Sequence, residues 1–192
     1  MLKKIILAAV VAATASFAQI NFGVHAGVDI NTLWGDDTED AASGIGFQAG
    51  AAAKISLPML PITIAPEVLI DMRNYDLRED VTTTEWALDI PVLVRFSLLP
   101  ILYLEAGPEL AFNLSTSTDY GNKVTVKADD DAFNTVEFDL VFGVGTGILP
   151  LVDIDFRVIL GLTNIYDDES IAGTSELDIK NMQFALGATY WF

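Results

Sequence analysis

Charged residues in this sequence recur at every second position of apolar segments, the spacing that places side chains on one face of a β-strand. Three arginines are spaced in this way among a larger number of carboxylates. Where one face of a sheet is enclosed, such side chains pair in salt bridges and hydrogen bonds. The residues that we expect in one polar network are Glu67, Arg73, Glu85, Arg95, Glu105, Glu109 and Arg157.

Catalytic chemistry has few candidates in this chain. His25 is the single histidine, and the absence of cysteine excludes disulfides and thiolate chemistry. A nucleophilic triad would need a serine beside His25, and no serine stands at a matching position on the first two expected strands. We therefore expect no enzyme, no catalytic residue and no cofactor, with His25 belonging to the polar network.

Acidic residues gather between the apolar segments, near residues 36–40, 129–131 and 167–169. Calcium is the ion that such oxygen ligands suit, but residues 129–137 lack the central glycine of an EF-hand loop. Solvated loops explain these acids more simply, so we expect no metal site. The sequence also has no phosphate-binding loop, no zinc-ligand spacing and no basic patch.

The elements that position these residues are strands with a period of two. About eight such segments are present, each of roughly 10 to 13 residues, enough to cross a bilayer when tilted. They cover residues 20–34, 45–55, 62–73, 85–96, 102–113, 136–145, 152–163 and 181–192. Leu177 and Ile179 are in the opposite phase, so the last strand either starts near Lys180 or holds a bulge.

The connections alternate in length. Three short ones each contain a Leu-Pro pair, at 57–58, 99–100 and 149–150, and the others are longer and acidic, with loops expected at 35–43, 74–84, 115–135 and around 167–169. Short turns at one end and long loops at the other are typical of outer-membrane barrels, with the short turns in the periplasm. We predict an all-β, eight-stranded antiparallel transmembrane up-and-down barrel.

Both ends of the chain fit export to an outer membrane. Residues 1–18 combine two lysines, a short apolar run and small residues before Gln19, as in a cleaved signal peptide, and the run is short for a retained anchor. Residues 19–192 then form the barrel domain. The chain ends in Tyr190, Trp191 and Phe192, an aromatic end that we interpret as the assembly signal of an outer-membrane barrel.

Composition separates the membrane barrel from its soluble alternative. The chain is 52% hydrophobic with a net charge of -17, which argues against nucleic-acid binding. A lipocalin-like barrel also alternates, but with its apolar face inside. Here the polar face is rich in glycine and alanine, which suits a narrow interior, and the apolar face carries aromatic residues near both ends. We therefore place the apolar face in lipid.

The strand pairing expected in two hairpins predicts two ion pairs. Folding around residues 74–84 places Arg73 near Glu85, and folding across Leu99 and Pro100 places Arg95 near Glu105. Acids outnumber bases on the inner face, so some carboxylates must share a proton, meet water or bind a cation.

Three prolines, at positions 66, 91 and 108, fall within expected strands, and each removes a donor from the ladder. We expect a bulge or bend at each, in preference to a lateral gap toward lipid.

Several segments resemble PorT-like outer-membrane barrels, which are common in Bacteroidetes and are similar in architecture to small OmpA/OmpX-type barrels. The segments are residues 64–69, 88–96, 103–110, 156–165 and 186–192. The resemblance implies the fold and a Gram-negative outer membrane but no particular activity. The turns here are more apolar than is usual for that family, and basic residues are few.

The expected function is a structural or surface-interaction role for a small barrel with a side-chain-filled polar lumen. Two alternatives stay open: a narrow pore or lipid-admitting transport barrel, and an assembly component of a secretion system. The expected partners are outer-membrane lipid and, during biogenesis, periplasmic chaperones and the barrel-assembly machinery. We expect a monomer.

Overall fold

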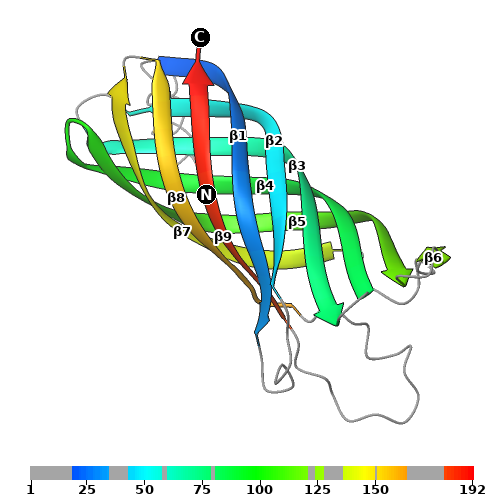
Figure 1. Cartoon of the computed structure of the whole chain (residues 1–192). Coiled ribbons are helices and arrows are strands. Elements are labelled where there is room, and N and C mark those ends of the chain that lie inside the picture. Colours follow the sequence, from blue (N-terminus) through cyan, green and yellow to red (C-terminus); the bar gives the residue numbers. More distant parts are fainter. Residues whose placement is uncertain are drawn as a thin grey trace, which may run out of the picture.

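In the computed structural model, the strands of this chain close into one barrel (Figure 1). The structure describes residues 19–34, 43–57, 60–78, 81–120, 124–127, 136–149, 151–163 and 180–192. The expected signal peptide and acidic loop stretches, with Leu177 and Ile179, lie outside these ranges. Among the described residues, no helix has the length and hydropathy needed to cross a bilayer.

Eight long strands form the wall, and a ninth, short strand lies at one end. The bounds are β1 Gln19–Trp34, β2 Gly44–Ser56, β3 Ile62–Arg78, β4 Val81–Leu99, β5 Leu102–Tyr120, β6 Val124–Lys127, β7 Val136–Leu149, β8 Val152–Gly161 and β9 Lys180–Trp191. Neighbours are antiparallel throughout. Pairing of β1 with β9 and of β4 with β5 closes the ring, which confirms the predicted eight-stranded barrel.

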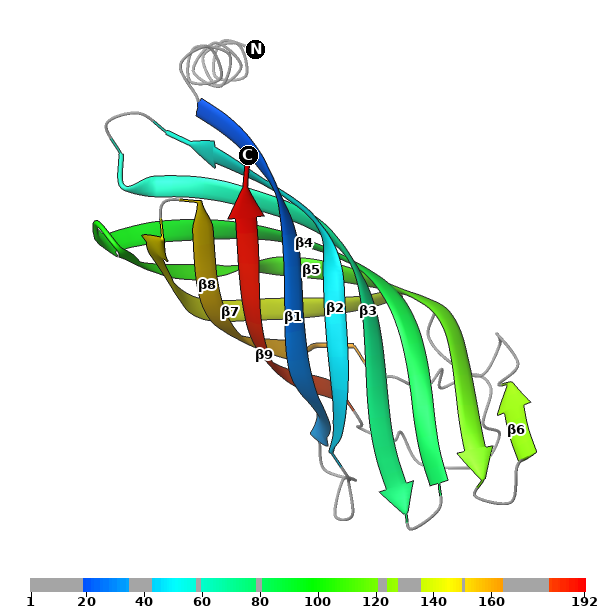
Figure 2. The ribbon, with the colours of Figure 1, turned by 45° about the horizontal axis from the view of Figure 1, so that its top comes forward.

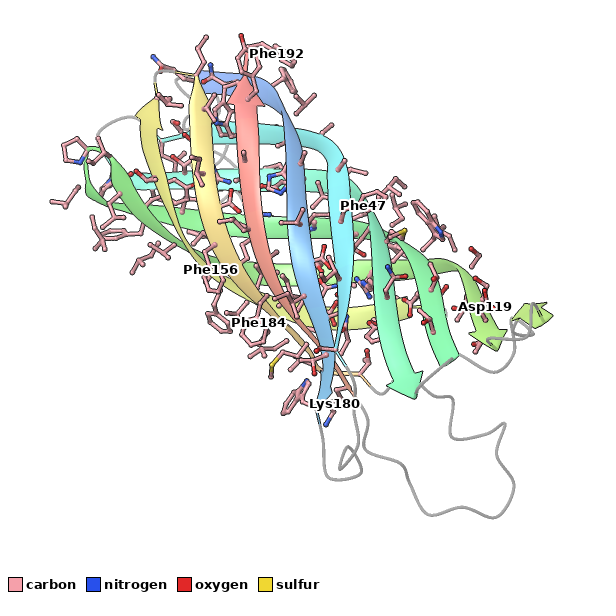
Figure 3. All side chains as sticks on the ribbon, viewed as in Figure 1. Phe47, Asp119, Phe156, Lys180, Phe184 and Phe192 are labelled. Atoms are coloured by element: carbon pink, nitrogen blue, oxygen red, sulfur yellow. The ribbon has the colours of Figure 1, made fainter. Side chains whose placement is uncertain are left out.

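The outer face of the barrel is apolar, as the alternation predicts. Exposed side chains such as Phe22 (64% exposed) and Leu186 (55%) alternate with buried polar residues along each strand. Phe47, Phe156 and Phe184 project away from the barrel axis (Figure 3). Large apolar side chains in contact with solvent on every long strand are costly in water, so this surface is suited to lipid.

The expected loops at 74–84 and 115–135 are wrong in part, because strands continue into both. β3 and β4 run on past Arg73 as far as the paired residues Arg78 and Val81, and β5 continues to Tyr120, where β6 pairs with it (Figure 2). The polar composition of these stretches predicted loops. Cross-strand hydroxyl contacts, such as Thr83 Oγ1 to Thr118 Oγ1 at 3.0 Å, hold the ladder together where apolar pairs are missing.

The three prolines interrupt the ladder without bulges, so of the expected bulge or bend at each, the bulge is wrong. The pairing of β2 with β3 skips Pro66, that of β3 with β4 skips Pro91, and that of β4 with β5 skips Pro108. The register is the same on both sides of every gap. At the third gap, a Cβ on Gly107 would collide with the carbonyl oxygen of Val92, so the two backbones lie close together. This close approach argues against a lateral opening there.

The closed ladder leads to a first prediction. Each wall strand is hydrogen-bonded to a neighbour on both sides, so the barrel has no free edge at which detergent could begin to separate the strands. We expect refolded protein in SDS to migrate differently before and after boiling. Identical migration of the two samples on a gel would contradict a closed barrel.

A second prediction tests the two faces of β7. Leu140 faces outward and Val141 is buried inside the barrel. Leu140→Arg should lower the free energy of unfolding by roughly 2–4 kcal/mol, because it places a charge in hydrocarbon. Val141→Thr, the matched control, should cost less. Urea titrations of protein folded into lipid vesicles measure both, and equal or reversed effects would mean that the faces are inverted.

Candidate functional site

The barrel interior holds a cluster of ion pairs near the short turns. We define this short-turn cluster as Lys54, Glu67, Arg95, Glu105, Asp153, Asp155 and Arg157. Arg157 donates to both oxygens of Glu67, at 2.8 and 2.9 Å, and to Glu105 at 2.8 Å. Arg95 donates to the other oxygen of Glu105 at 2.9 Å and to Glu67 at 3.3 Å. The two guanidiniums and two carboxylates thus form one closed, buried ring of charge-assisted hydrogen bonds.

The register places these groups as the sequence predicts. Arg95 and Glu105 are direct cross-strand partners between β4 and β5. Arg73 and Glu85 are likewise partners between β3 and β4, although their closest charged atoms are 3.6 Å apart. Both predicted pairings are confirmed. Sequence reasoning did not show that each arginine serves several carboxylates.

A second cluster lies nearer the long loops and is strongly acidic. We define this loop-end cluster as Asp29, Asp71, Arg73, Glu85, Asp89, Glu109, Glu137 and Asp139. Arg73 is fully buried and donates to Asp71 at 2.8 Å, to both oxygens of Asp89 at 3.0 Å and to Glu137 at 3.3 Å. Within the described ranges, Arg73 is the only lysine or arginine that forms ion pairs with these acids.

Several acids of the loop-end cluster lie away from Arg73. Both oxygens of Asp139 and one oxygen of Glu109 are buried without a hydrogen-bond partner among the described residues. Carboxylates in this position require protons, water or cations to balance them. Among all the residues that the structure describes, no group of three acidic or histidine side chains is arranged to hold a metal ion.

An apolar layer separates the two clusters inside the barrel. We define it as the buried, inward-facing residues Ala65, Leu69, Leu93, Val141, Ile159 and Ala185, five of which form one contact cluster. Leu69 stands on β3 between Glu67 and Asp71, and Ile159 follows Arg157 on β8. No ion pair between described residues crosses this layer. Among the described residues, the two clusters are therefore separate networks of ion pairs.

Neutral polar residues complete the network, and sequence reasoning missed their roles. Trp191 faces inward and donates to Asp153 at 2.8 Å, so of the aromatic end only Tyr190 and Phe192 face outward. Gln183 donates to Asp71 at 2.9 Å, and the Tyr75 hydroxyl donates to Asn181 at 3.0 Å. The sequence did offer one indication of these contacts, because each of these residues occupies an inward-facing position in the strand alternation.

His25 belongs to the polar interior, as expected. Its Nδ1 lies 2.9 Å from the hydroxyl of Thr189, and both side chains are buried. A Cβ on Gly187 would collide with the His25 ring, so that glycine makes room for it. The hydroxyl partner of the histidine is thus a buried threonine within the barrel wall, not a serine open to substrate.

A closed antiparallel barrel with an apolar exterior and a charged interior defines the class of small outer-membrane β-barrels. Residues 15–167 match the family described as outer membrane protein beta-barrel domain, and the chain belongs to that family.

Two solved structures show the same fold. Neisserial surface protein A (NspA) has a TM-score of 0.60 and 14% identity, with 89% of this chain and 97% of that chain covered. Ail, the attachment invasion locus protein of Yersinia pestis, has a TM-score of 0.50 and 12% identity, with 91% and 99% covered. A search of the curated proteins found no match.

The unequal clusters predict unequal costs for losing an arginine. Arg73→Met removes the only described ion-pair partner of the loop-end cluster and should lower the free energy of unfolding by about 3–5 kcal/mol. Arg95→Met should cost less, because Arg157 still donates to Glu67 and Glu105. Urea titrations in lipid vesicles compare the two. Adding Asp89→Asn should restore part of the loss in Arg73→Met, and a larger loss in Arg95→Met would contradict the division into two clusters.

Proposed function

We propose that this chain is a non-conducting, non-enzymatic outer-membrane barrel with a structural or surface-interaction role. The observation that supports this most directly is the apolar layer, which lies between the two ionic clusters inside the barrel. Ions crossing the barrel would have to leave their hydration shells in that layer. A protein built in this way can anchor and present its loop end without opening a path through the membrane.

The loop end is the part of the barrel suited to interactions. β4 and β5 continue there through a stretch rich in threonine and serine, and β6 lies beside the tip of β5 (Figure 2). Ail was solved in complex with the heparin analogue sucrose octasulfate. The net charge of -17 disfavours such a polyanionic ligand for this chain and favours neutral or cationic partners.

Export and assembly follow from the two ends of the chain. We infer that residues 1–18 direct export and are removed, and that Tyr190, Trp191 and Phe192 are read by the barrel-assembly machinery after escort by periplasmic chaperones. The mature protein then works as a monomer in outer-membrane lipid. PorT-like membership, in the Bacteroidetes sense, is the finer assignment that the resembling segments support.

The alternatives have less support. A narrow pore is opposed by the apolar layer, and a lipid-admitting wall is opposed by the close approach of β4 and β5 at Gly107. A role as an assembly component of a secretion system predicts a protein partner, which cross-linking in whole cells followed by pulldown would identify.

Conductance in planar bilayers tests the proposed function. The wild-type barrel should show no steady single-channel current. Replacing Leu69, Leu93 and Val141 together by serine should create a small, cation-selective conductance, because the layer becomes polar beneath the acidic cluster. Serine at the outward-facing Val92 and Leu140 is the matched control and should leave the barrel silent. Steady current through wild-type protein would overturn the proposal and support the pore.

A further inference from the structure

The short-turn cluster contains one carboxylate more than it has cations. Its carboxylates are Glu67, Glu105, Asp153 and Asp155, and its cations are Lys54, Arg95 and Arg157. Lys54 and Asp153 are its partly exposed members, and the excess of one carboxylate remains when both are left out. An unbalanced charge inside the barrel is costly, so the cluster needs one more positive charge.

Asp155 is the carboxylate that lacks hydrogen bonds. Its side chain is buried, and neither oxygen has a hydrogen-bond partner among the described residues. Arg157 Nε lies 2.9 Å from Asp155 Oδ1, but its N–H group donates to Glu105. Glu67 and Glu105, in contrast, accept hydrogen bonds from both arginines of the cluster. The missing positive charge is therefore needed beside Asp155.

His25 places a nitrogen without a partner beside this carboxylate. Its Nδ1 lies 2.9 Å from the Thr189 hydroxyl, whereas its buried Nε2 has no hydrogen-bond partner among the described residues. The position that a Cβ on Gly187 would take is 2.7 Å from His25 Nε2 and 3.1 Å from Asp155 Oδ1. The ring and the carboxylate thus border the same small space, which exists because residue 187 has no side chain.

The two groups face each other where the barrel closes. β9 lies between β1 and β8 (Figure 1), and its Gly187 is the cross-strand partner of Gly27 on one side and of Asp155 on the other. His25 on β1 and Asp155 on β8 therefore meet over a glycine of the last strand. A bond between them ties the first strand to β8 across β9.

The other titratable groups around this pair come from five strands. They are Lys54 from β2, Glu67 from β3, Arg95 from β4, Tyr103 and Glu105 from β5, and Asp153 and Arg157 from β8. β7 and β9 add no charged side chain at this end among the described residues. Each described cation here is bonded to or ion-paired with another acid, and the Tyr103 hydroxyl is neutral. A proton is therefore the remaining source of positive charge.

We propose that His25 and Asp155 together hold one proton at neutral pH, and that this proton supplies the missing positive charge of the short-turn cluster. The proton joins the ring to the carboxylate across the space beside Gly187. Its loss at higher pH leaves Asp155 charged without a hydrogen bond and weakens the tie between β1 and β8. The pair is thus a pH-sensitive link at the closure of the barrel. It is independent of the proposed function, because a silent barrel and a conducting one would both contain it.

The direction of the pH dependence follows from the unfolded chain. A free histidine titrates near pH 6.5 and a free aspartate near pH 4, so above about pH 7 neither retains its proton. Between that pH and the pH at which the folded pair releases its proton, the folded protein binds one proton more than the unfolded chain. Stability therefore falls as pH rises, by up to about tenfold in the unfolding equilibrium constant per pH unit.

The single histidine makes the pair directly observable. Protein labelled with ¹⁵N-histidine and refolded in dodecyl maltoside micelles gives ring signals from His25 alone. We expect these signals to change between about pH 7 and about pH 10, as the pair loses its proton. Asp155→Asn keeps the shape of the side chain and removes its charge. In this variant the ring should be neutral, with constant signals over the same range.

Thr189→Val is the matched control. It removes the partner of the other ring nitrogen at nearly constant volume, so the change in the His25 signals should persist. Urea titrations in lipid vesicles give a second measurement. The unfolding equilibrium constant of the wild type should rise relative to that of Asp155→Asn, by up to about tenfold per pH unit above about pH 7. A gel shift on boiling verifies that each variant is folded.

Three results would overturn the proposal. His25 signals in the wild type that stay constant from about pH 7 to about pH 10 would show that the pair has no proton to release. The same change of signals in Asp155→Asn would show that the carboxylate takes no part. A ratio of the two unfolding constants that does not vary with pH would show that the proton does not stabilise the barrel. The wild-type signals test the proposal even where Asp155→Asn does not fold.

Discussion

Every backbone N–H and C=O group that lies in hydrocarbon needs a partner within the protein, because lipid offers none. For this chain the requirement is met by closing eight long strands into a ring. Closure then decides the rest. It fixes the alternation of side chains between lipid and interior, and it makes the interior narrow. Charges that face inward must consequently find partners within the barrel.

The interior meets this demand unevenly. Near the short turns, two arginines share two glutamates in a closed ring. Within this ring, positive and negative charges are equal in number. Near the loops, one arginine stands among many carboxylates. The apolar layer between them keeps the two arrangements independent. The barrel can therefore be rich in buried charge while no ion pair between described residues joins its two ends.

The strand positions, the facing of each side chain and the pairs Arg73–Glu85 and Arg95–Glu105 follow from the sequence, because a period of two and short turns determine register. The strand extensions beyond Arg73 and through Thr118 did not follow, since threonine and asparagine suit both loops and hydroxyl-paired strands. The shared ring of arginines and glutamates and the inward bond of Trp191 depend on strands that meet only after closure. Local pattern carries no information on those distant contacts.

The gaps at Pro66, Pro91 and Pro108 fall on three successive strand pairs and leave the register unchanged. They form a diagonal line along which the wall has fewer hydrogen bonds but no missing residue. Fewer hydrogen bonds hold the strands together at these gaps than elsewhere in the wall. We therefore expect the barrel wall to bend more easily there than at fully paired positions. Deformation along this line needs no change in strand pairing, because the register is the same on both sides of each gap.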